Sequence, residues 1–238
     1  MERYTIEFLH EVDSTNDYLK SKVRSSKLTG QYCVSASVQT SGRGQRENTW
    51  FSEPFANVLC SFLLDESEKL KEVPLISYAA CLDVVNVLKK NGIENPKIKW
   101  PNDVYVRGRK IAGILIENLW SEGKNQKSII GIGINVNQKS FSEIKATSMM
   151  QEMKSSFETV NVLTELYTEI YKSLELPKDA ILRDVNSQLL YEGEYVTFEE
   201  GDRLNEYIVK QMLENGNLEV QQAQNIFELE HHRVKWKV

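Results

Sequence analysis

A long helical pattern separates two groups of short strand-like segments, and this arrangement constrains the fold more than any other feature of the chain. Pro74 begins the helix and Asn91-Gly92 ends it. One face of the helix carries apolar residues at helical spacing, namely Leu75, Ala79, Leu82, Val85 and Leu88. Strand-like segments precede and follow this helix. The pattern therefore predicts an α+β fold.

The other elements suggest one large domain and a small C-terminal one. Short strands are predicted at Thr5–Leu9, Gln31–Val38, Val58–Leu64, Lys97–Trp100, Val104–Val106, Lys110–Glu117 and Ser128–Asn137. A helix follows Ser14-Thr15-Asn16, and residues 143–189 are mostly helical by pattern. From Tyr191 the chain becomes β-prone, which favours a small β-barrel over an extension of the sheet. We predict domains at 1–189 and 190–238, which the length of 238 residues allows.

Charge and cysteine content exclude several classes of protein. Lys and Arg total 29 against 34 Asp and Glu, so the formal net charge is -5 at pH 7. This balance gives no general attraction to nucleic acid or to a membrane surface. The three cysteines include no C-x-x-C pair, so they form neither a disulfide framework nor a zinc site. With no secretory signal and no membrane-spanning apolar run, we expect a soluble cytoplasmic protein.

Motifs for several kinds of catalysis are absent. The chain has no G-x-x-x-x-G-K-[ST] phosphate loop. Gly131-x-Gly133 lacks a third glycine and lies in a strand pattern, so it does not indicate a dinucleotide-binding fold. We interpret His231-His232 as surface residues, which disfavours a Ser-His-Asp triad or a zinc hydrolase. The chemistry is therefore expected from Lys, Arg, Asn, Asp and backbone amides.

Two polar segments near the N-terminus are candidates for ligand binding. Ser14-Thr15-Asn16 has the composition of a helix cap, but cap hydroxyls and helix amides can also bind a small polar ligand. The second segment runs from Gln39 to Ser52 and alternates glycine with arginine. Such glycines let the backbone approach an anion while the guanidinium groups bind it. A solvated turn is the alternative interpretation of this segment.

Two further segments lie around the short central strands. Lys99-Trp100-Pro101-Asn102-Asp103 places a cation, an amide and a carboxylate in five residues. Asp103 could hold a metal ion or orient an amine and Lys99 could neutralise a phosphate, although a plain turn fits the composition equally well. Lys110 begins an apolar strand, where it is available to a carboxylate. The strand glycines Gly113, Gly131 and Gly133 indicate a close approach to the sheet, by a ligand or by a packed helix.

In this order the segments resemble the signature of biotin protein ligases, which share S-T-N, Q-x-x-G-R-G-x-x, K-W-P-N-D, K-x-x-G-I-L-x-E and G-x-G-x-N. The match runs from Thr5 to Asn137, and K-W-P-N-D with K-x-x-G-I-L-x-E is its most specific part. The resemblance implies a mixed β-sheet with flanking helices, a catalytic domain like that of class II aminoacyl-tRNA synthetases. It also implies that the C-terminal segment is a small SH3-like β-barrel.

The family resemblance implies a two-step ligase that uses ATP, Mg²⁺ and biotin. The biotin carboxylate attacks the α-phosphate of ATP to give biotinyl-5′-AMP and pyrophosphate. A lysine of a biotin carboxyl carrier protein or domain then attacks the mixed anhydride and releases AMP. Positioned cations and hydrogen-bond donors suit this chemistry. We expect a monomer or homodimer that binds neither nucleic acid nor membrane, because the helix-turn-helix of the family's repressor members has no counterpart before the first motif.

The resemblance also implies roles for individual residues. It assigns catalysis to Lys110, Asp103 and Arg43, and the metal ion to Asp103. It assigns biotin binding to Ser14, Thr15, Asn16, Gln39, Arg43, Gly44, Gln45 and Lys110. It assigns ATP binding to Arg46, Trp50, Lys99, Asn102 and Asn135, with Trp100 as an apolar wall beside Trp50.

The chain departs from the family pattern in its Gly/Arg loop, which leaves alternative functions open. Where many relatives have G-R-G-R-[RW]-G, this chain has Gln45 in place of a basic residue and Glu47 in place of a glycine. A non-catalytic biotin-binding module is therefore one alternative. A lipoate or octanoate protein ligase is another, although K-W-P-N-D and S-T-N argue against it. A transcriptional co-repressor is disfavoured by the net charge.

Overall fold

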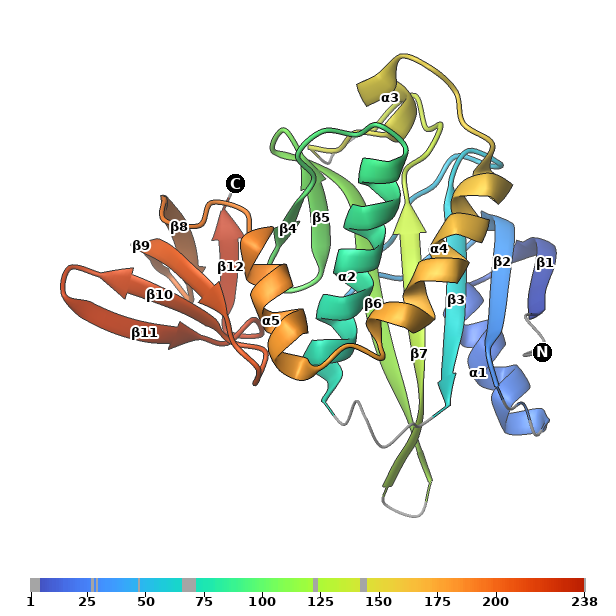
Figure 1. Ribbon diagram of the computed structural model, residues 1–238, viewed down its shortest axis with the longest axis horizontal. Helices are drawn as coiled ribbons and strands as arrows, with labels where there is room; N and C mark the ends of the chain where they lie inside the picture. Colours follow the sequence, from blue (N-terminus) through green and yellow to red (C-terminus); the bar gives the residue numbers. More distant parts are fainter. Residues whose placement is uncertain are drawn as a thin grey trace.

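The strands form two sheets, one of seven strands and one of five, and the helices pack on the larger sheet (Figure 1). This computed structural model describes residues 5–26, 28, 30–46, 48–65, 72–121, 124–141 and 145–237. The order of strands across the large sheet is β1 (Thr5–Val12), β2 (Tyr32–Gln39), β3 (Val58–Asp65), β7 (Lys124–Ile134), β6 (Arg109–Ser121), β5 (Asp103–Val106) and β4 (Lys97–Lys99). β1 and β2 pair in parallel and the other neighbours are antiparallel, so the sheet is mixed, as predicted.

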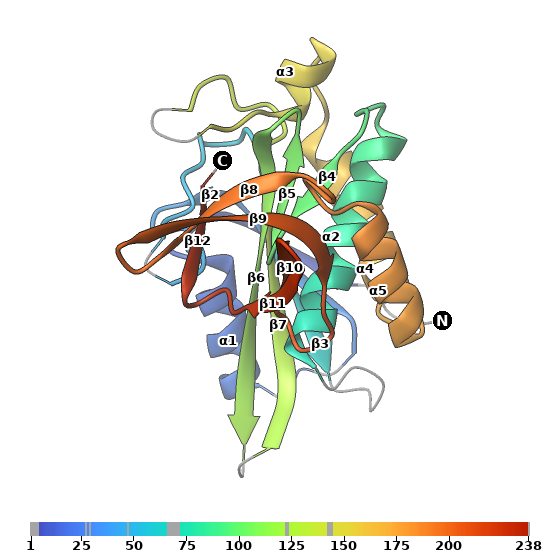
Figure 2. The same cartoon turned by 90° about the vertical axis from the view of Figure 1, so that its left-hand side faces the viewer.

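Helices cover the two faces of the large sheet unequally. α1 (Thr15–Ser25) lies on one face, whereas α2 (Val73–Lys90), α4 (Thr159–Ser173) and α5 (Lys178–Ser187) lie on the other (Figure 2). α2 is the helix predicted from Pro74, and most of its residues are buried. The predicted helical region after residue 143 contains α3 (Met149–Met153), α4 and α5. The α+β prediction is therefore confirmed.

The C-terminal strands form an open sheet, which differs from the predicted closed barrel. The order is β11 (Asn225–Leu229), β10 (Leu218–Gln222), β9 (Arg203–Met212), β8 (Tyr195–Glu200) and β12 (Val234–Lys237). β11 and β12 occupy opposite edges, and within the part of the chain that the structure describes they do not pair with each other. The sequence pattern missed β12, whose pairing with β8 makes it an edge strand.

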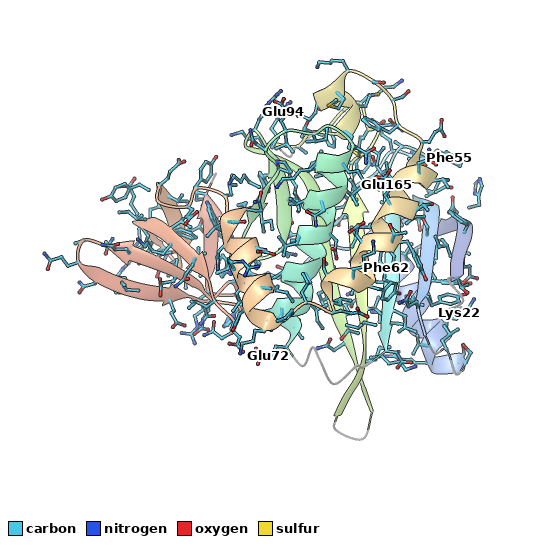
Figure 3. The ribbon with its side chains drawn as sticks, viewed as in Figure 1. Lys22, Phe55, Phe62, Glu72, Glu94 and Glu165 are labelled. Atoms are coloured by element: carbon cyan, nitrogen blue, oxygen red, sulfur yellow. The ribbon has the colours of Figure 1, made fainter. Side chains whose placement is uncertain are left out.

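The apolar core is continuous from the large sheet to the small one. Phe62 of β3 lies beneath α4 and packs against Tyr167 and Tyr171 (Figure 3). The same buried cluster extends through α2 and α5 to residues of the second sheet such as Phe198 and Val209. Backbone groups of β9 are also tied to α5, because the Asn186 side chain exchanges two hydrogen bonds with Met212, at 2.7 and 3.1 Å. α5 therefore joins the two sheets.

The prediction made from the cysteines is confirmed. All three cysteines are buried free thiols, so they form no disulfide. None of the described helices combines the length and the apolar character that crossing a membrane requires.

A buried carboxyl group on α2 makes the stability of the fold depend on pH. Asp83 is inaccessible to solvent and accepts a hydrogen bond from Ser173 of α4. Burial raises the pKa of Asp83 well above its ordinary value, and the Ser173 hydroxyl opposes this only in part. The folded protein therefore holds the Asp83 proton more tightly than the unfolded chain does. Stability is lost as pH rises above the ordinary carboxyl value of about 3.9.

Asp83→Asn should therefore raise the melting temperature at pH 8 by about 2–4 °C, because the neutral amide avoids burying a charge. The gain should vanish near pH 3, about one unit below the ordinary carboxyl pKa, where both states of the chain are largely protonated at this position. Thermal unfolding followed by circular dichroism across this pH range measures the effect. Asp202→Asn, which changes an exposed carboxyl group, serves as the control. An equal gain at every pH would contradict the role given to Asp83.

Candidate active site

The predicted site residues line one pocket of about 850 Å³ on the α1 side of the large sheet. β12 of the second sheet lies on the same side as α1 (Figure 2) and supplies part of the pocket wall. Every residue assigned to catalysis or binding lies in the lining, namely Ser14, Thr15, Asn16, Gln39, Arg43, Gly44, Gln45, Arg46, Trp50, Lys99, Asn102, Asp103, Lys110 and Asn135. Folding thus gathers residues spread over more than half of the sequence.

The first turn of α1 supplies the neutral hydrogen-bonding groups of the pocket. Ser14 is the N-cap residue, and its hydroxyl accepts from the Asp17 amide at 3.4 Å. Thr15 donates both its amide and its hydroxyl to Gln39 Oε1, at 2.8 and 3.0 Å. Both interpretations of this segment are therefore correct. Ser14 caps the N-terminus of α1, and the same turn lines the pocket.

Two side chains outside the predicted set hold the Asn16 amide. Ser61 of β3 donates to Asn16 Oδ1 at 2.6 Å, and Asn16 Nδ2 donates to Glu117 Oε2 of β6 at 2.8 Å. Ser61 is buried among apolar neighbours on its strand, which is the one sequence signal that could have identified it. Glu117 ends the K-x-x-G-I-L-x-E motif, but the sequence alone gave it no role.

The Gly/Arg loop folds back on itself and makes contacts to both sides of the pocket. Trp50 N donates to Gly42 O at 2.9 Å, and Arg43 forms an isolated bridge with Thr49. The Arg43 guanidinium pairs with Asp17 at 2.7 Å and with Glu117 at 3.2 Å. Arg46 donates to the backbone carbonyl of His231. These contacts to other parts of the chain argue against the interpretation of the loop as a solvated turn. Glu47 lies outside the described residues.

The second cluster of predicted residues forms the cationic end of the pocket. Lys110 Nζ lies 2.6 Å from Asp103 Oδ1, and both side chains are about four-fifths buried, with exposed fractions of 23% and 20%. Lys99 is more deeply placed, with its ammonium over the rings of Tyr105 and Trp236 at 5.4 and 5.7 Å. Burial lowers the pKa of Lys99, because desolvation disfavours the ammonium ion, and the nearby Asp103 opposes this shift.

Asn102 and Asn135 contribute to the pocket as buried amides already bound to the backbone. Asn102 Nδ2 donates to the Ile114 carbonyl, and Asn135 Nδ2 donates to the Thr147 carbonyl at 3.1 Å. These bonds fix both side chains and use one hydrogen of each amide, which leaves the amide oxygen and the second amide hydrogen for other contacts.

Strand glycines make room for the pocket floor. A methyl group at Gly133 would lie 2.5 Å from the Trp50 ring, and one at Gly113 would lie 3.1 Å from it. A methyl group at Gly131 would collide with the Asn16 amide. The two interpretations of these glycines are therefore both partly right: a helix residue packs at Gly131, and a pocket residue packs at Gly113 and Gly133. Trp50 Nε1 is buried and has no hydrogen-bond partner within the described part of the chain.

The C-terminal wall of the pocket was not predicted. His231 and four residues of β12, Val234, Lys235, Trp236 and Lys237, belong to the lining. The His231 ring lies 6.2 Å from that of Trp100, in an edge-to-face arrangement, and burial lowers its pKa. His232 is largely exposed. The prediction that both histidines are surface residues is therefore confirmed, but it missed that the exposed His231 also lines the pocket.

The described residues contain no group of three or more His, Cys, Asp or Glu side chains that could hold a metal ion. Asp103 is the one predicted ligand, and its Oδ1 is occupied by Lys110. A single carboxylate is compatible with a magnesium ion whose other ligands are mostly water molecules and phosphate oxygens.

The fold and the pocket together define an α+β protein in which one pocket joins neutral hydrogen-bonding side chains to cationic ones. The chain belongs to the Biotin/lipoate A/B protein ligase family, whose sequence profile matches residues 8–135. This confirms the family resemblance carried by the motifs.

Two curated relatives show where this similarity lies. The bifunctional ligase/repressor BirA of Escherichia coli is 31% identical over 175 residues, which cover 72% of this chain and 54% of BirA. A biotin--[acetyl-CoA-carboxylase] ligase of Paracoccus denitrificans is 32% identical over 130 residues, which cover 54% of this chain and 53% of that protein. The chain thus spans about half the length of these relatives.

A solved structure extends the similarity over the whole chain. The biotin protein ligase of Aquifex aeolicus, in complex with biotin and ATP, superposes with a TM-score of 0.83 at 27% identity. The superposition covers 98% of each chain, so it includes the C-terminal sheet.

The packing of Trp50 on Gly133 gives a first prediction for the site. Gly133→Ala should lower the free energy of unfolding by about 1–3 kcal/mol, because the new methyl group overlaps the indole ring. In a Trp50→Ala background the same change should cost less than about 0.5 kcal/mol, since the space is then open. Urea denaturation of the four proteins measures both values. Equal costs in the two backgrounds would contradict the contact.

Proposed function

We propose that this protein is a biotin protein ligase, which activates biotin with ATP as biotinyl-5′-AMP and transfers it to a lysine of a carrier domain. The observation that carries the proposal is that one pocket joins a neutral end, at Thr15, Asn16 and Gln39, to a cationic end, at Lys99 and Lys110. The neutral ureido ring of biotin needs the first environment. Its carboxylate and the ATP phosphates need the second.

In the first step a carboxylate oxygen of biotin attacks the α-phosphorus of ATP. The bond from that phosphorus to the bridging oxygen breaks, and pyrophosphate leaves. The two reactants are both anionic, so the main task of the protein is to hold them together and neutralise their charge. We assign Lys110 to binding the biotin carboxylate. We assign Arg43, Lys99 and Arg46 to neutralising the negative charge of the two reactants around it.

In the second step the carrier lysine attacks the carbonyl carbon of the mixed anhydride. The carbon–oxygen bond to AMP breaks, AMP leaves with the electron pair, and the new amide loses a proton. Asp103 is the carboxylate available to accept a hydrogen bond from the incoming amine, because it lies beside Lys110 at the pocket. We assign Asn102, Asn135 and Trp50 to ATP.

Mg²⁺, when bound with ATP, supplies additional positive charge against the triphosphate. Asp103 is the residue that would hold it, through the carboxylate oxygen that does not contact Lys110. The acceptor we propose is the biotin carboxyl carrier protein or domain of a biotin-dependent carboxylase, supported by the name of the Paracoccus denitrificans relative. We further propose cytoplasmic action as a monomer or homodimer without nucleic acid, supported by the net charge of -5.

We also propose that residues 1–189 act as the catalytic domain and residues 190–238 as a small second domain. The separate strand order of β8 to β12 supports this division. The open sheet would be the counterpart of the SH3-like barrel implied by the family, and β12 would complete the wall of the pocket.

Pyrophosphate release tests the proposed function. The protein with ATP and Mg²⁺ should release pyrophosphate when biotin is added, and not when lipoate or octanoate is added. Those two acids are the necessary comparison, because the matched family includes lipoate ligases. If pyrophosphate is released with lipoate or octanoate but not with biotin, that acid is the substrate and biotin is not. Biotin binding in calorimetry without any release would instead support a non-catalytic binding module.

Lys110→Ala should raise the barrier to adenylate formation by about 1.5–3 kcal/mol, because a charge-assisted contact to the biotin carboxylate is lost. This corresponds to a rate about 10- to 100-fold lower in the pyrophosphate assay. Lys22→Ala removes a lysine that pairs with Glu7 outside the pocket, and serves as the control. An unchanged rate in Lys110→Ala would remove Lys110 from the site.

Gln45→Arg should slow the escape of biotinyl-5′-AMP, since it adds a cation to the pocket lining where the intermediate would lie. We expect free adenylate in the medium to appear several-fold more slowly, about 3- to 10-fold, at an equal rate of pyrophosphate release. Chromatography of the filtered medium measures the adenylate. Escape at the original rate would contradict the placement of Gln45 over the intermediate.

A further inference from the structure

Glu117 of β6 is the acidic residue around which the neutral end of the pocket is built. Its carboxylate accepts from Asn16 Nδ2 at 2.8 Å and pairs with Lys20 at 3.0 Å and Arg43 at 3.2 Å. The side chain is only 19% exposed. Glu117 is not part of the pocket lining, so it can act on a ligand only through the residues it holds.

The first of these residues is Asn16, whose amide Glu117 orients. An ionised carboxylate accepts hydrogen bonds and donates none, so the Asn16 amide must turn its nitrogen toward Glu117. On the other side the Ser61 hydroxyl lies 2.6 Å from Asn16 Oδ1. Gly131 leaves no space between this amide and the sheet. Because the Ser61 hydroxyl can donate or accept, it is the Glu117 carboxylate that fixes the orientation, and one amide hydrogen remains for a ligand in the pocket.

The second residue is Arg43, which connects Glu117 to the Gly/Arg loop. Arg43 reaches Glu117 with one guanidinium nitrogen and Asp17 of α1 with the other. Lys20 bridges the same two carboxylates, at 2.6 Å from Asp17 and 3.0 Å from Glu117. Two cations and two anions thus form a balanced cluster that docks the loop on the first two turns of α1.

We propose that Glu117 is a positioning residue for the acid substrate, which presents the Asn16 amide in one orientation and docks the Gly/Arg loop beside it. This inference rests on the proposed function, because it takes biotin as the ligand whose ureido ring meets Asn16. Glu117 touches neither the ligand nor the reacting atoms. Its effect should therefore appear in the affinity for biotin itself, measured without ATP.

Glu117→Gln tests the proposal with little change in shape. A glutamine amide can present either its oxygen or its nitrogen, so the Asn16 amide is free to turn over. The substitution also removes a negative charge from two cations. We expect the dissociation constant for biotin, measured by calorimetry without ATP, to rise about tenfold, as for the loss of one charge-assisted hydrogen bond. The KM for ATP in the pyrophosphate assay should change by a smaller factor, because Arg46 and Trp50 of the loop are also held by His231 and by the sheet.

Glu7→Gln is a matched control, because Glu7 holds the same helix from strand β1. Glu7 of β1 accepts hydrogen bonds from Tyr18 and Lys22 of α1 and from Tyr32 of β2, at 2.7 to 2.8 Å. Lys22 lies on the outer part of α1 (Figure 3), and Glu7 is not part of the pocket lining. Glu7→Gln therefore weakens the attachment of α1 without touching Asn16, and should leave the affinity for biotin unchanged.

Glu117→Asp keeps the inference testable if the glutamine variant does not fold. It retains the charge but withdraws the carboxylate by one methylene group, so it should raise the dissociation constant for biotin by a smaller factor, about threefold. Melting temperatures of all variants identify any that are unfolded. A folded Glu117 variant with the original affinity for biotin would overturn the inference. An equal loss of affinity in Glu7→Gln would overturn it too, because the effect would then come from the attachment of α1.

Failure of the proposed function has a different signature. If the unmodified protein neither binds biotin nor releases pyrophosphate with it, the ligand is wrong whatever the variants do. If the unmodified protein binds biotin and Glu117→Gln alone weakens binding, both the ligand and the positioning role are supported.

Discussion

The contact on which the pocket depends is the close packing of α1 and Trp50 on the glycine-bearing face of β6 and β7. Gly131 faces Asn16, and Gly113 and Gly133 face the Trp50 ring. Because these strand positions carry no side chain, the first turn of a helix and an indole lie directly on the sheet. Ser61 of β3 and Glu117 of β6 then reach the Asn16 amide. A side chain at Gly131 would displace the Asn16 amide at the neutral end of the pocket, and one at Gly113 or Gly133 would crowd the Trp50 ring.

The cationic end of the pocket is arranged so that an anionic ligand improves its electrostatics. Lys99 is buried enough to lower the pKa of its ammonium group. Lys110 is paired with Asp103, and Arg43 is paired with Asp17 and Glu117. A bound carboxylate or phosphate would add negative charge beside Lys99, and would return its pKa toward the ordinary value. The free-energy cost of burying these cations is part of folding. The ligand can therefore bind to them without that cost.

Local patterns predicted most of the large sheet and α2 correctly, because those elements carry their signals within a few residues. The Pro74 start and the apolar face give α2, and short apolar runs give β2, β3 and β7. β12 was missed, since Val234–Lys237 becomes a strand by pairing with β8. The open order of the second sheet could not be predicted either, because it depends on which distant strands pair.

The sequence by itself determined which residue types are present for the chemistry, and the order of its motifs determined the family. Only the tertiary structure decided how those residues work together. It paired Asn16 with Ser61 and Glu117, which lie 45 and 101 positions away in the chain, and it brought His231 and β12 to the pocket. The physical reason is that cap, strand and turn signals act between near neighbours, whereas ion pairs and amide orientation depend on groups that meet only when the sheet and α1 pack together.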